Sequence, residues 1–294
     1  MKLTDPREIA KVTREAVAVA LTQFASSRGL LETGASEVSV APEPRAGTEP
    51  LAGFKTGADE SPFAGETPAS DHPRALAVES YARLGADIGL RLRNGFLDRV
   101  ETFAAALALW GAKLNLTSAP DDPAEIAFHI LDSLAPLIFG RRGLAGGAFR
   151  TGSKVLDLGI GAGFPALILA AASDADFALL EARRKRASFL GLTAAEMGLS
   201  NAQVNSSHSD SFQLKPVFDV VTARAFAEPA VVFDTARAAL KPGGHVILYA
   251  SPAQRATIDL AATHSFEPSV FIEYEVPRGA TLVAHILATA RRIA

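Results

Sequence analysis

The sequence contains no cysteine in 294 residues. Without cysteine a chain forms neither disulfide bonds nor thiolate metal sites, which excludes disulfide-stapled secreted folds and zinc fingers. A cysteine-free composition suits the reducing cytoplasm, so we expect a cytoplasmic protein that needs no metal.

Long uncharged apolar runs are also missing. The longest near the start, 16–27, is too short to span a bilayer and follows acidic residues that a signal peptide would lack. We therefore expect no membrane partner.

The chain has little net charge, only −3, but its charged residues are unevenly distributed. Segment 32–73 contains eight acidic and two basic residues, together with six Pro and five Gly. Such a composition cannot offset the entropy cost of ordering, so this segment is predicted to be a disordered linker. The near-neutral remainder permits a local RNA-binding patch without requiring one.

Apolar periodicity divides the rest of the chain. We predict a helical N-terminal extension over 1–31, a helical cap over 74–145 and a ligand-binding domain over 146–294. The first helix is expected over 5–28, and its apolar positions are Ile9, Val12, Ala16, Val19 and Phe24.

Beyond residue 153, apolar strands alternate with helical stretches, which is typical of βαβ units around a parallel sheet. The expected strands are 154–158, 176–181, 202–206, 217–223, 244–249, 268–275 and 281–288. The expected helices are about 164–172, 183–198, 228–240 and 252–262, with a turn at 241–244. This order predicts an α/β fold of the Rossmann-like methyltransferase class, with a seven-stranded, mostly parallel sheet that ends in a hairpin.

A glycine turn follows the first strand of this sheet. Gly159, Gly161 and Gly163 are spaced G-x-G-x-G with Asp157 two residues before them, which differs from the G-x-G-x-x-G of a dinucleotide site. The ammonium group of S-adenosylmethionine suits a nearby carboxylate such as that of Asp157, so these four residues are predicted to bind that cofactor. The alternative is a structural turn in which Asp157 only caps the next segment.

Glu181 ends the second predicted strand, eighteen residues beyond Gly163. An acidic side chain at this position can accept hydrogen bonds from both ribose hydroxyls of the cofactor. A solvated strand end is the alternative interpretation.

Several further segments complete a recognisable pattern. They are Trp110 with Asn115-Leu116-Thr117-Ser118, His129-Ile130-Leu131-Asp132-Ser133, Leu180-Glu181 with Lys185-Arg186 and Phe189-Leu190, and Ala223-Arg224-Ala225-Phe226-Ala227. Together with the glycine turn, they make residues 76–290 resemble the bacterial small-subunit ribosomal RNA methyltransferase G family (RsmG or GidB), which makes 7-methylguanosine in 16S ribosomal RNA.

The resemblance implies roles for further residues. Gly159 and Phe164 would line the S-adenosylmethionine pocket, Ser209 and Asp210 would hold the adenine, and Arg224 would close the site as its catalytic residue. An Arg after an apolar strand can contact the cofactor, a phosphate or guanine, so we expect it to contribute to the site more than to the fold. A structural salt bridge is the alternative.

Two other groups of polar residues allow more than one interpretation. The run 183–186 of Arg183, Arg184, Lys185 and Arg186 opens a helix, where it either contacts RNA phosphate or forms a solvated face. His129 and Asp132 lie three apart on one helical face and are predicted to form a hydrogen-bonded core pair rather than a catalytic one.

The resemblance implies a monomer that acts on 16S ribosomal RNA or the small ribosomal subunit. N7 of guanine has a lone pair and no proton, so no general base is needed. Several departures from the family remove mostly cationic groups. Phe128 stands where Arg is usual, Gly111 where Asn is usual, Tyr249-Ala250-Ser251 where Leu-Lys-Gly is usual, Thr281-Leu282 where Arg-His is usual, and His208 and Asp210 where Arg and Glu are usual. A diverged methyltransferase with another substrate and a noncatalytic binding module on the same fold are therefore the alternatives.

Overall fold

The computed structural model describes residues 3–27, 92–139, 148–206, 214–262 and 265–293. The predicted linker, 32–73, lies outside these residues. Within the described ranges, no helix is both long and apolar enough to cross a membrane.

A seven-stranded sheet forms the centre of the molecule, with the strand order β3-β2-β1-β4-β5-β7-β6. The five strands from β3 to β5 run parallel, and β7 and β6 are antiparallel to their neighbours. The strands are β1 (Lys154–Leu158), β2 (Asp176–Leu180), β3 (Ala202–Asn205), β4 (Phe218–Arg224), β5 (Leu240–Ala250), β6 (Val270–Arg278) and β7 (Thr281–Arg291). The predicted seven-stranded, mostly parallel sheet with a final hairpin is confirmed.

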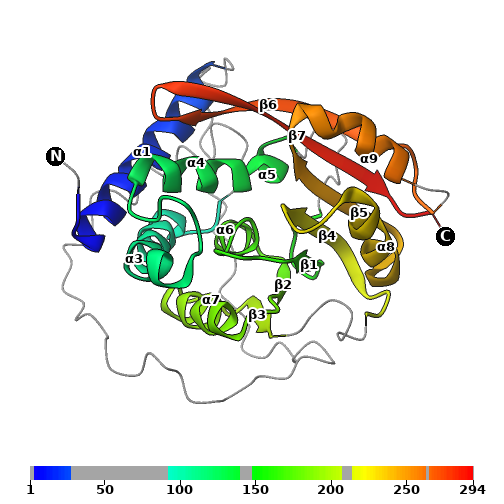
Figure 1. Cartoon of the computed structure of the whole chain (residues 1–294), viewed down its shortest axis with the longest axis horizontal. Helices are drawn as coiled ribbons and strands as arrows, with labels where there is room; N and C mark the ends of the chain where they lie inside the picture. Colours follow the sequence, from blue (N-terminus) through cyan, green and yellow to red (C-terminus); the bar gives the residue numbers. More distant parts are fainter. Residues whose placement is uncertain (1–2, 28–91, 140–147, 207–213, 263–264, 294) are drawn as a thin grey trace, which may run out of the picture.

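Helices cover both faces of the sheet, because successive strand residues point to opposite faces and the residues on each face are apolar. Val155 of β1 belongs to the apolar cluster formed with α3, α4, α6 and α7, whereas its neighbour Leu156 belongs to the cluster formed with α8 and α9. The helices are α3 (Phe96–Leu114), α4 (Pro123–Ser133), α5 (Ala135–Phe139), α6 (Ala166–Ala172), α7 (Arg184–Glu196), α8 (Pro229–Ala239) and α9 (Arg255–Ala261). Their arrangement around the sheet can be followed in Figure 1.

The N-terminal helix, α1 (Pro6–Ser27), packs against α3 and α4 (Figure 1). Its buried face is formed by Ile9, Thr13, Val17 and Leu21. Val12 and Val19, expected on the apolar face, are instead 40% and 54% exposed. The predicted helix is present and Ile9 is buried as expected. Val12 and Val19 were assigned to the wrong face, because Thr13, which donates to the Ile9 carbonyl, occupies a core position.

The final hairpin extends beyond the parallel part of the sheet. Strands β6 and β7 pair from Val270 with Thr289 to Arg278 with Thr281, and β6 packs on α4. Figure 1 shows this hairpin crossing over the cap helices. Residues from the final hairpin therefore reach α4.

Two predicted elements differ in form from the observed ones. The expected turn at 241–244 is part of β5, whose pairing with β4 shifts register between Phe218 and Val220. The expected helix 252–262 is divided into a 3-10 turn, η2 (Pro252–Gln254), and α9. In both places the local sequence contains Pro, which indicates an interruption but not its form.

Candidate active site

The glycine loop joins β1 to α6, and its three glycines have different neighbours. Gly159, Gly161 and Gly163 all have positive φ angles, of 66°, 58° and 109°. A Cβ on Gly163 would be 2.8 Å from the ring of Phe103, so this glycine allows α3 to approach the loop. A Cβ on Gly161 would meet no atom closer than 3.8 Å. The loop is therefore open to a ligand at Gly161 and closed against the cap at Gly163.

Glu181 immediately follows β2 and faces this loop. One carboxylate oxygen accepts a hydrogen bond from Gly161 N–H at 3.1 Å, and the other accepts from Arg183 N–H at 2.8 Å. The residue is 6% exposed, so it is not a solvated strand end. Each oxygen retains a lone pair that can accept from a ribose hydroxyl. The open loop and this carboxylate fit S-adenosylmethionine.

Asp157 has a different environment from the predicted one. Its side chain is fully buried within β1 and accepts a hydrogen bond from the Thr222 hydroxyl. Burial raises the pKa of Asp157 to about 8, so the carboxyl is largely neutral at pH 7. This burial does not favour the predicted ion pair with the cofactor ammonium, and Glu181 is the carboxylate that faces the loop.

Phe164 follows the glycine loop and packs between the cap and the sheet. Its ring centroid is 5.1 Å from those of Phe103 and His129, and the Arg224 guanidinium lies 5.6 Å from the ring centre. The ring is 8% exposed. It therefore supports Arg224 in addition to forming an apolar wall.

Helix α4 supplies the polar residues that meet Arg224. The helix begins at Pro123, where Asp122 accepts a hydrogen bond from Ala124 N–H as the N-cap. From this start, His129 and Asp132 lie one turn apart on the side that faces β4.

Arg224 ends β4 and lies between these two residues. Its Nε is 3.3 Å from Asp132 Oδ2, and its Nη2 donates to His129 Nδ1 at 2.6 Å. The third guanidinium nitrogen, Nη1, is buried and has no hydrogen-bond partner among the described residues. The predicted direct hydrogen bond between His129 and Asp132 is wrong, because Arg224 bridges them.

The charges around Arg224 are arranged to hold a fixed cation. Burial and then the nearby Arg224 lower the pKa of His129 to about 4, which leaves a neutral ring whose Nδ1 can accept. Burial raises the pKa of Asp132, but hydrogen bonding from His285 and the charge of Arg224 outweigh burial and lower it. An anionic Asp132 therefore compensates the Arg224 guanidinium.

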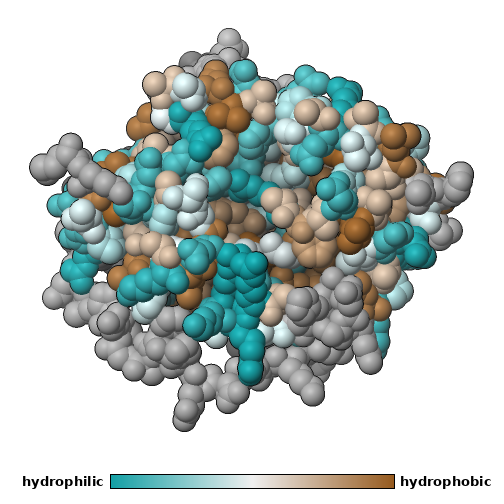
Figure 2. Space-filling view, viewed as in Figure 1, coloured by the Kyte–Doolittle hydropathy of each residue, from teal (hydrophilic) through white to brown (hydrophobic). Residues whose placement is uncertain are grey.

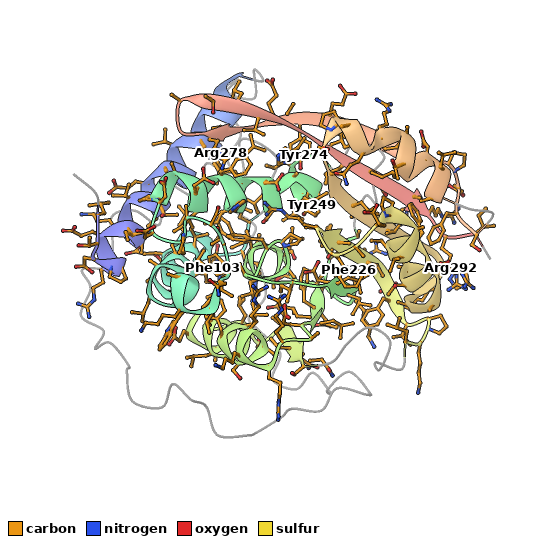
Figure 3. All side chains as sticks on the ribbon, in the orientation of Figure 1. Phe103, Phe226, Tyr249, Tyr274, Arg278 and Arg292 are labelled. Atoms are coloured by element: carbon orange, nitrogen blue, oxygen red, sulfur yellow. The ribbon has the colours of Figure 1, made fainter. Side chains whose placement is uncertain are left out.

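Three residues in this cluster were not anticipated from the sequence. Tyr274 on β6 and His285 on β7 donate to Asp132 Oδ1 at 2.6 and 2.7 Å, and Tyr249 on β5 donates to the Ser133 carbonyl at 2.8 Å. Figure 3 shows Tyr249 and Tyr274 toward α4 and the final hairpin. Their partners are more than a hundred residues away in the sequence, so no local pattern indicates these contacts.

The remaining predicted site residues are placed as follows. Ser209 and Asp210 lie outside the described residues. Arg183 and Lys185 are exposed at the start of α7, whereas Arg186 donates to the Asn115 carbonyl at the end of α3. Figure 2 shows hydrophilic side chains gathered in the lower centre of the viewed face, over the area of α7 and β3.

A sheet of this strand order, with an open glycine loop after β1 and a carboxylate at the end of β2, defines an S-adenosylmethionine-dependent methyltransferase. Within that class, the sequence profile of the family named rRNA small subunit methyltransferase G matches residues 97–279. The chain belongs to this family. The predicted family, enzyme class and cofactor are thereby confirmed.

Individual relatives agree with the family match. The chain is 34% identical over 174 residues to ribosomal RNA small subunit methyltransferase G of Acidovorax ebreus, covering 57% of this chain and 76% of that one. It is 31% identical over 213 residues to the protein of the same name in Streptococcus thermophilus, covering 69% and 87%. A solved S-adenosylmethionine-dependent O-methyltransferase from Thermotoga maritima superposes with a TM-score of 0.42 at 18% identity, covering 50% and 61%. The strand order, and not this overlap, identifies the fold.

Proposed function

We propose that this protein transfers a methyl group from S-adenosylmethionine to N7 of a guanine in 16S ribosomal RNA. Family membership supports the ribosomal RNA substrate. The observation that carries the chemistry is a fixed cation, Arg224, held by Asp132 and a neutral His129 beside the open glycine loop. The substrate is either free 16S ribosomal RNA or the small ribosomal subunit.

The cofactor would be held by the backbone of residues 159–163 and by Glu181. When bound, it supplies an electrophilic methyl group on a sulfonium centre. Phe164 would cover the apolar part of the cofactor, and Ser209 and Asp210 are proposed to hold its adenine. The neutral Asp157 would shape the strand beneath the loop rather than supply charge.

Arg224 would act on the substrate without moving a proton. N7 of guanine carries a lone pair, so the site needs to orient the base and exclude water. The unpartnered Nη1 of Arg224 can donate to guanine O6 or to a phosphate. His129, with its pKa near 4, is neutral at physiological pH and serves as an acceptor for Arg224.

A second arginine lies near a position where the chain departs from its family. The Arg278 guanidinium lies 5.4 Å from the ring centre of Phe128, and its Nη2 donates to Glu125 at 2.8 Å. A cation from β6 is thus present beside Phe128, where the family usually has Arg. Glu125 compensates the charge of this guanidinium, so Arg278 would bind an RNA phosphate only by exchanging that carboxylate.

We further propose that the protein acts as a cytoplasmic monomer. Size-exclusion chromatography with light scattering measures the mass in solution, and a mass of about 31 kDa is expected from the 30.8 kDa chain.

Mapping of 7-methylguanosine tests the proposed function directly. Ribosomal RNA from cells with and without this protein is treated with borohydride and aniline, which cleave the chain at 7-methylguanosine. One 16S cleavage site is expected to disappear in the cells that lack the protein and to return when purified protein and S-adenosylmethionine are added to their small subunits. An identical cleavage pattern in both cell types would refute the guanine N7 assignment. Methyl transfer to another RNA position or to protein would identify a diverged methyltransferase.

A further inference from the structure

A cavity of about 250 Å³ lies at the carboxyl ends of β4 and β5. Its apolar lining includes Phe226, Val232 and Ile258, and its polar lining includes Asp132, Arg224, Gln254 and His285. An apolar cavity with a few convergent polar groups is typical of a site for a small or flat ligand. The parallel strands of an α/β sheet place ligands at this same edge.

Phe226 lies at the boundary between this cavity and the glycine loop. It follows β4 by two residues, and the intervening Ala225 has a left-handed φ of 52°. The Phe226 ring packs so closely on Gly159 that a Cβ on Gly159 would collide with it. The same side chain lines the cavity. Figure 3 shows Phe226 beside β4, close to where β1 ends.

The backbone at Ala225 indicates that the direction of Phe226 matters. The left-handed backbone conformation is sterically unfavourable for a residue other than glycine. Such a residue adopts it where the surrounding structure requires it. Here the left-handed turn follows Arg224 immediately and sends Phe226 toward Gly159. One short segment thus presents a cation and an aromatic ring to the same cavity.

The polar lining supplies both hydrogen-bond donors and an acceptor. The Gln254 side-chain oxygen accepts from both Ser251 N–H, at 3.0 Å, and the Ser251 hydroxyl, at 3.2 Å. This orientation directs the carboxamide oxygen to Ser251, so the NH₂ group is the part of Gln254 available to a ligand. Nη1 of Arg224, which has no hydrogen-bond partner among the described residues, adds another donor, and Asp132 Oδ2 adds an acceptor. Guanine presents the acceptor O6 beside the donor N1–H, so its edge can meet both kinds of group.

We propose that Phe226 is the positioning residue on which the unstacked target guanine lies, with the base in the cavity at the ends of β4 and β5. This inference rests on the proposed function and assigns its base-binding subsite. An unpaired base loses its stacking partners, and an aromatic side chain restores stacking at a fixed place. Because Phe226 also contacts Gly159, the stacked base is held directly beside the cofactor loop.

Three variants separate stacking from simple packing. Phe226→Leu keeps an apolar side chain against Gly159 but removes the aromatic face, whereas Phe226→Tyr keeps that face. Val231→Ala on α8 is the matched control, because Val231 is an apolar side chain 48% exposed outside the cavity. Each is assayed on small subunits that lack the methyl group, and S-adenosylhomocysteine affinity is measured separately by calorimetry.

Stacking predicts a specific pattern of effects. Phe226→Leu should reduce kcat/KM for the subunit roughly tenfold or more, the size expected for loss of one base–aromatic contact. Phe226→Tyr and Val231→Ala should stay within about twofold of the wild type, and S-adenosylhomocysteine affinity should stay within about threefold in all variants. Full activity of Phe226→Leu would overturn the proposal. An equal loss of S-adenosylhomocysteine affinity would also overturn it and make Phe226 a wall of the cofactor site.

A fluorescence measurement decides the question even if Phe226→Leu folds poorly. In a short RNA, the guanine identified by the mapping experiment is replaced by 6-methylisoxanthopterin. This fluorescent guanine analogue keeps the O6 carbonyl, and its emission falls when it stacks on an aromatic ring. The wild type and Phe226→Tyr, with S-adenosylhomocysteine present, should quench this emission, and Phe226→Leu should not. Binding without quenching by the wild type would refute stacking. Absence of methyl transfer by the wild type to small subunits and to free 16S ribosomal RNA would instead refute the proposed function itself.

Discussion

Arg224 Nε, at the end of β4, lies 3.3 Å from Asp132 Oδ2 on α4, and the Asp132 side chain is completely buried. This ion pair joins the helical cap to the carboxyl end of the sheet. It gives Arg224 a structural role in addition to the predicted role in the site, because a buried carboxylate that loses its cation is strongly destabilising. The salt-bridge interpretation and the site interpretation of Arg224 are therefore compatible.

Substitution of Arg224 should affect both stability and activity. Arg224→Ala leaves Asp132 without its guanidinium, so the free energy of unfolding in urea should fall by about 3 kcal/mol. Arg224→Lys retains a charge and should lose less stability, about 1 kcal/mol, since an ammonium still compensates a carboxylate. Methyl transfer should nevertheless fall roughly tenfold in both variants, because an ammonium cannot reproduce the planar fork. Wild-type activity of Arg224→Lys would contradict a role for the guanidinium in the site.

A double-mutant cycle measures the coupling between the two residues. Urea denaturation of Arg224→Ala, Asp132→Asn and the double variant should give an interaction free energy of about 1–3 kcal/mol, since the residues share one buried network. The pair of Lys241 and Asp219 is a matched control, with side chains 45% and 35% exposed at 2.8 Å. Its coupling should be below about 1 kcal/mol because solvent screens it. Equal coupling in the two cycles would indicate that burial adds nothing to the Arg224 ion pair.

His129 should make stability depend on pH on the acid side. Its pKa is lowered from 6.5 to about 4 in the folded protein, so between these values the unfolded chain binds more protons. Stability therefore falls as the pH falls through this window, by about 2 kcal/mol between pH 7 and pH 5. His129→Gln retains an acceptor for Arg224 and does not titrate. Its stability relative to the wild type should therefore increase by about 2 kcal/mol when the pH falls from 7 to 5. Parallel stability curves for the two proteins would refute the lowered pKa.

The sheet could be predicted because its strands are buried on both faces and carry continuous apolar runs. Val155 and Leu156 lie on opposite faces, and both are fully buried, so the strand is recognisable without knowing its neighbours. The buried face of α1 could not be found in the same way, because Thr13 occupies the core while Val12 and Val19 are exposed. Only the packing of α1 on α3 and α4 decides which side is covered.

The candidate site was predictable where its chemistry is local. The glycine loop and Glu181 follow directly from strand ends, and both face the same opening. Asp132 could be singled out but not interpreted, because its partners Tyr274 and His285 come from the final hairpin. Asp157 could be located by the spacing of the motif, but the motif does not reveal the burial that neutralises its carboxyl.

A neutral Asp157 can be distinguished by experiment from an Asp157 that pairs with the cofactor ammonium. The pKa of Asp157 is raised from 3.8 to about 8 by burial, so between these values the folded protein binds more protons than the unfolded chain. The contribution of Asp157 to the free energy of unfolding of the wild type is greatest at low pH and is lost as the pH rises through 8. Asp157→Asn does not titrate, so its stability relative to the wild type should increase by about 3 kcal/mol between pH 6 and pH 9.

Cofactor affinity completes this test, because a neutral carboxyl and a charged one predict different results for the same substitution. If Asp157 is neutral at pH 7, Asp157→Asn should bind S-adenosylmethionine within about threefold of the wild type in calorimetry, since no charge is removed. Glu181→Gln removes the charge that faces the loop and should weaken binding roughly tenfold, the loss of a charge-assisted hydrogen bond. Glu273→Gln, an exposed partner of Arg255, is the control and should change nothing. A tenfold loss in Asp157→Asn with little change in Glu181→Gln would restore Asp157 as the counterion of the cofactor ammonium and remove Glu181 from that site.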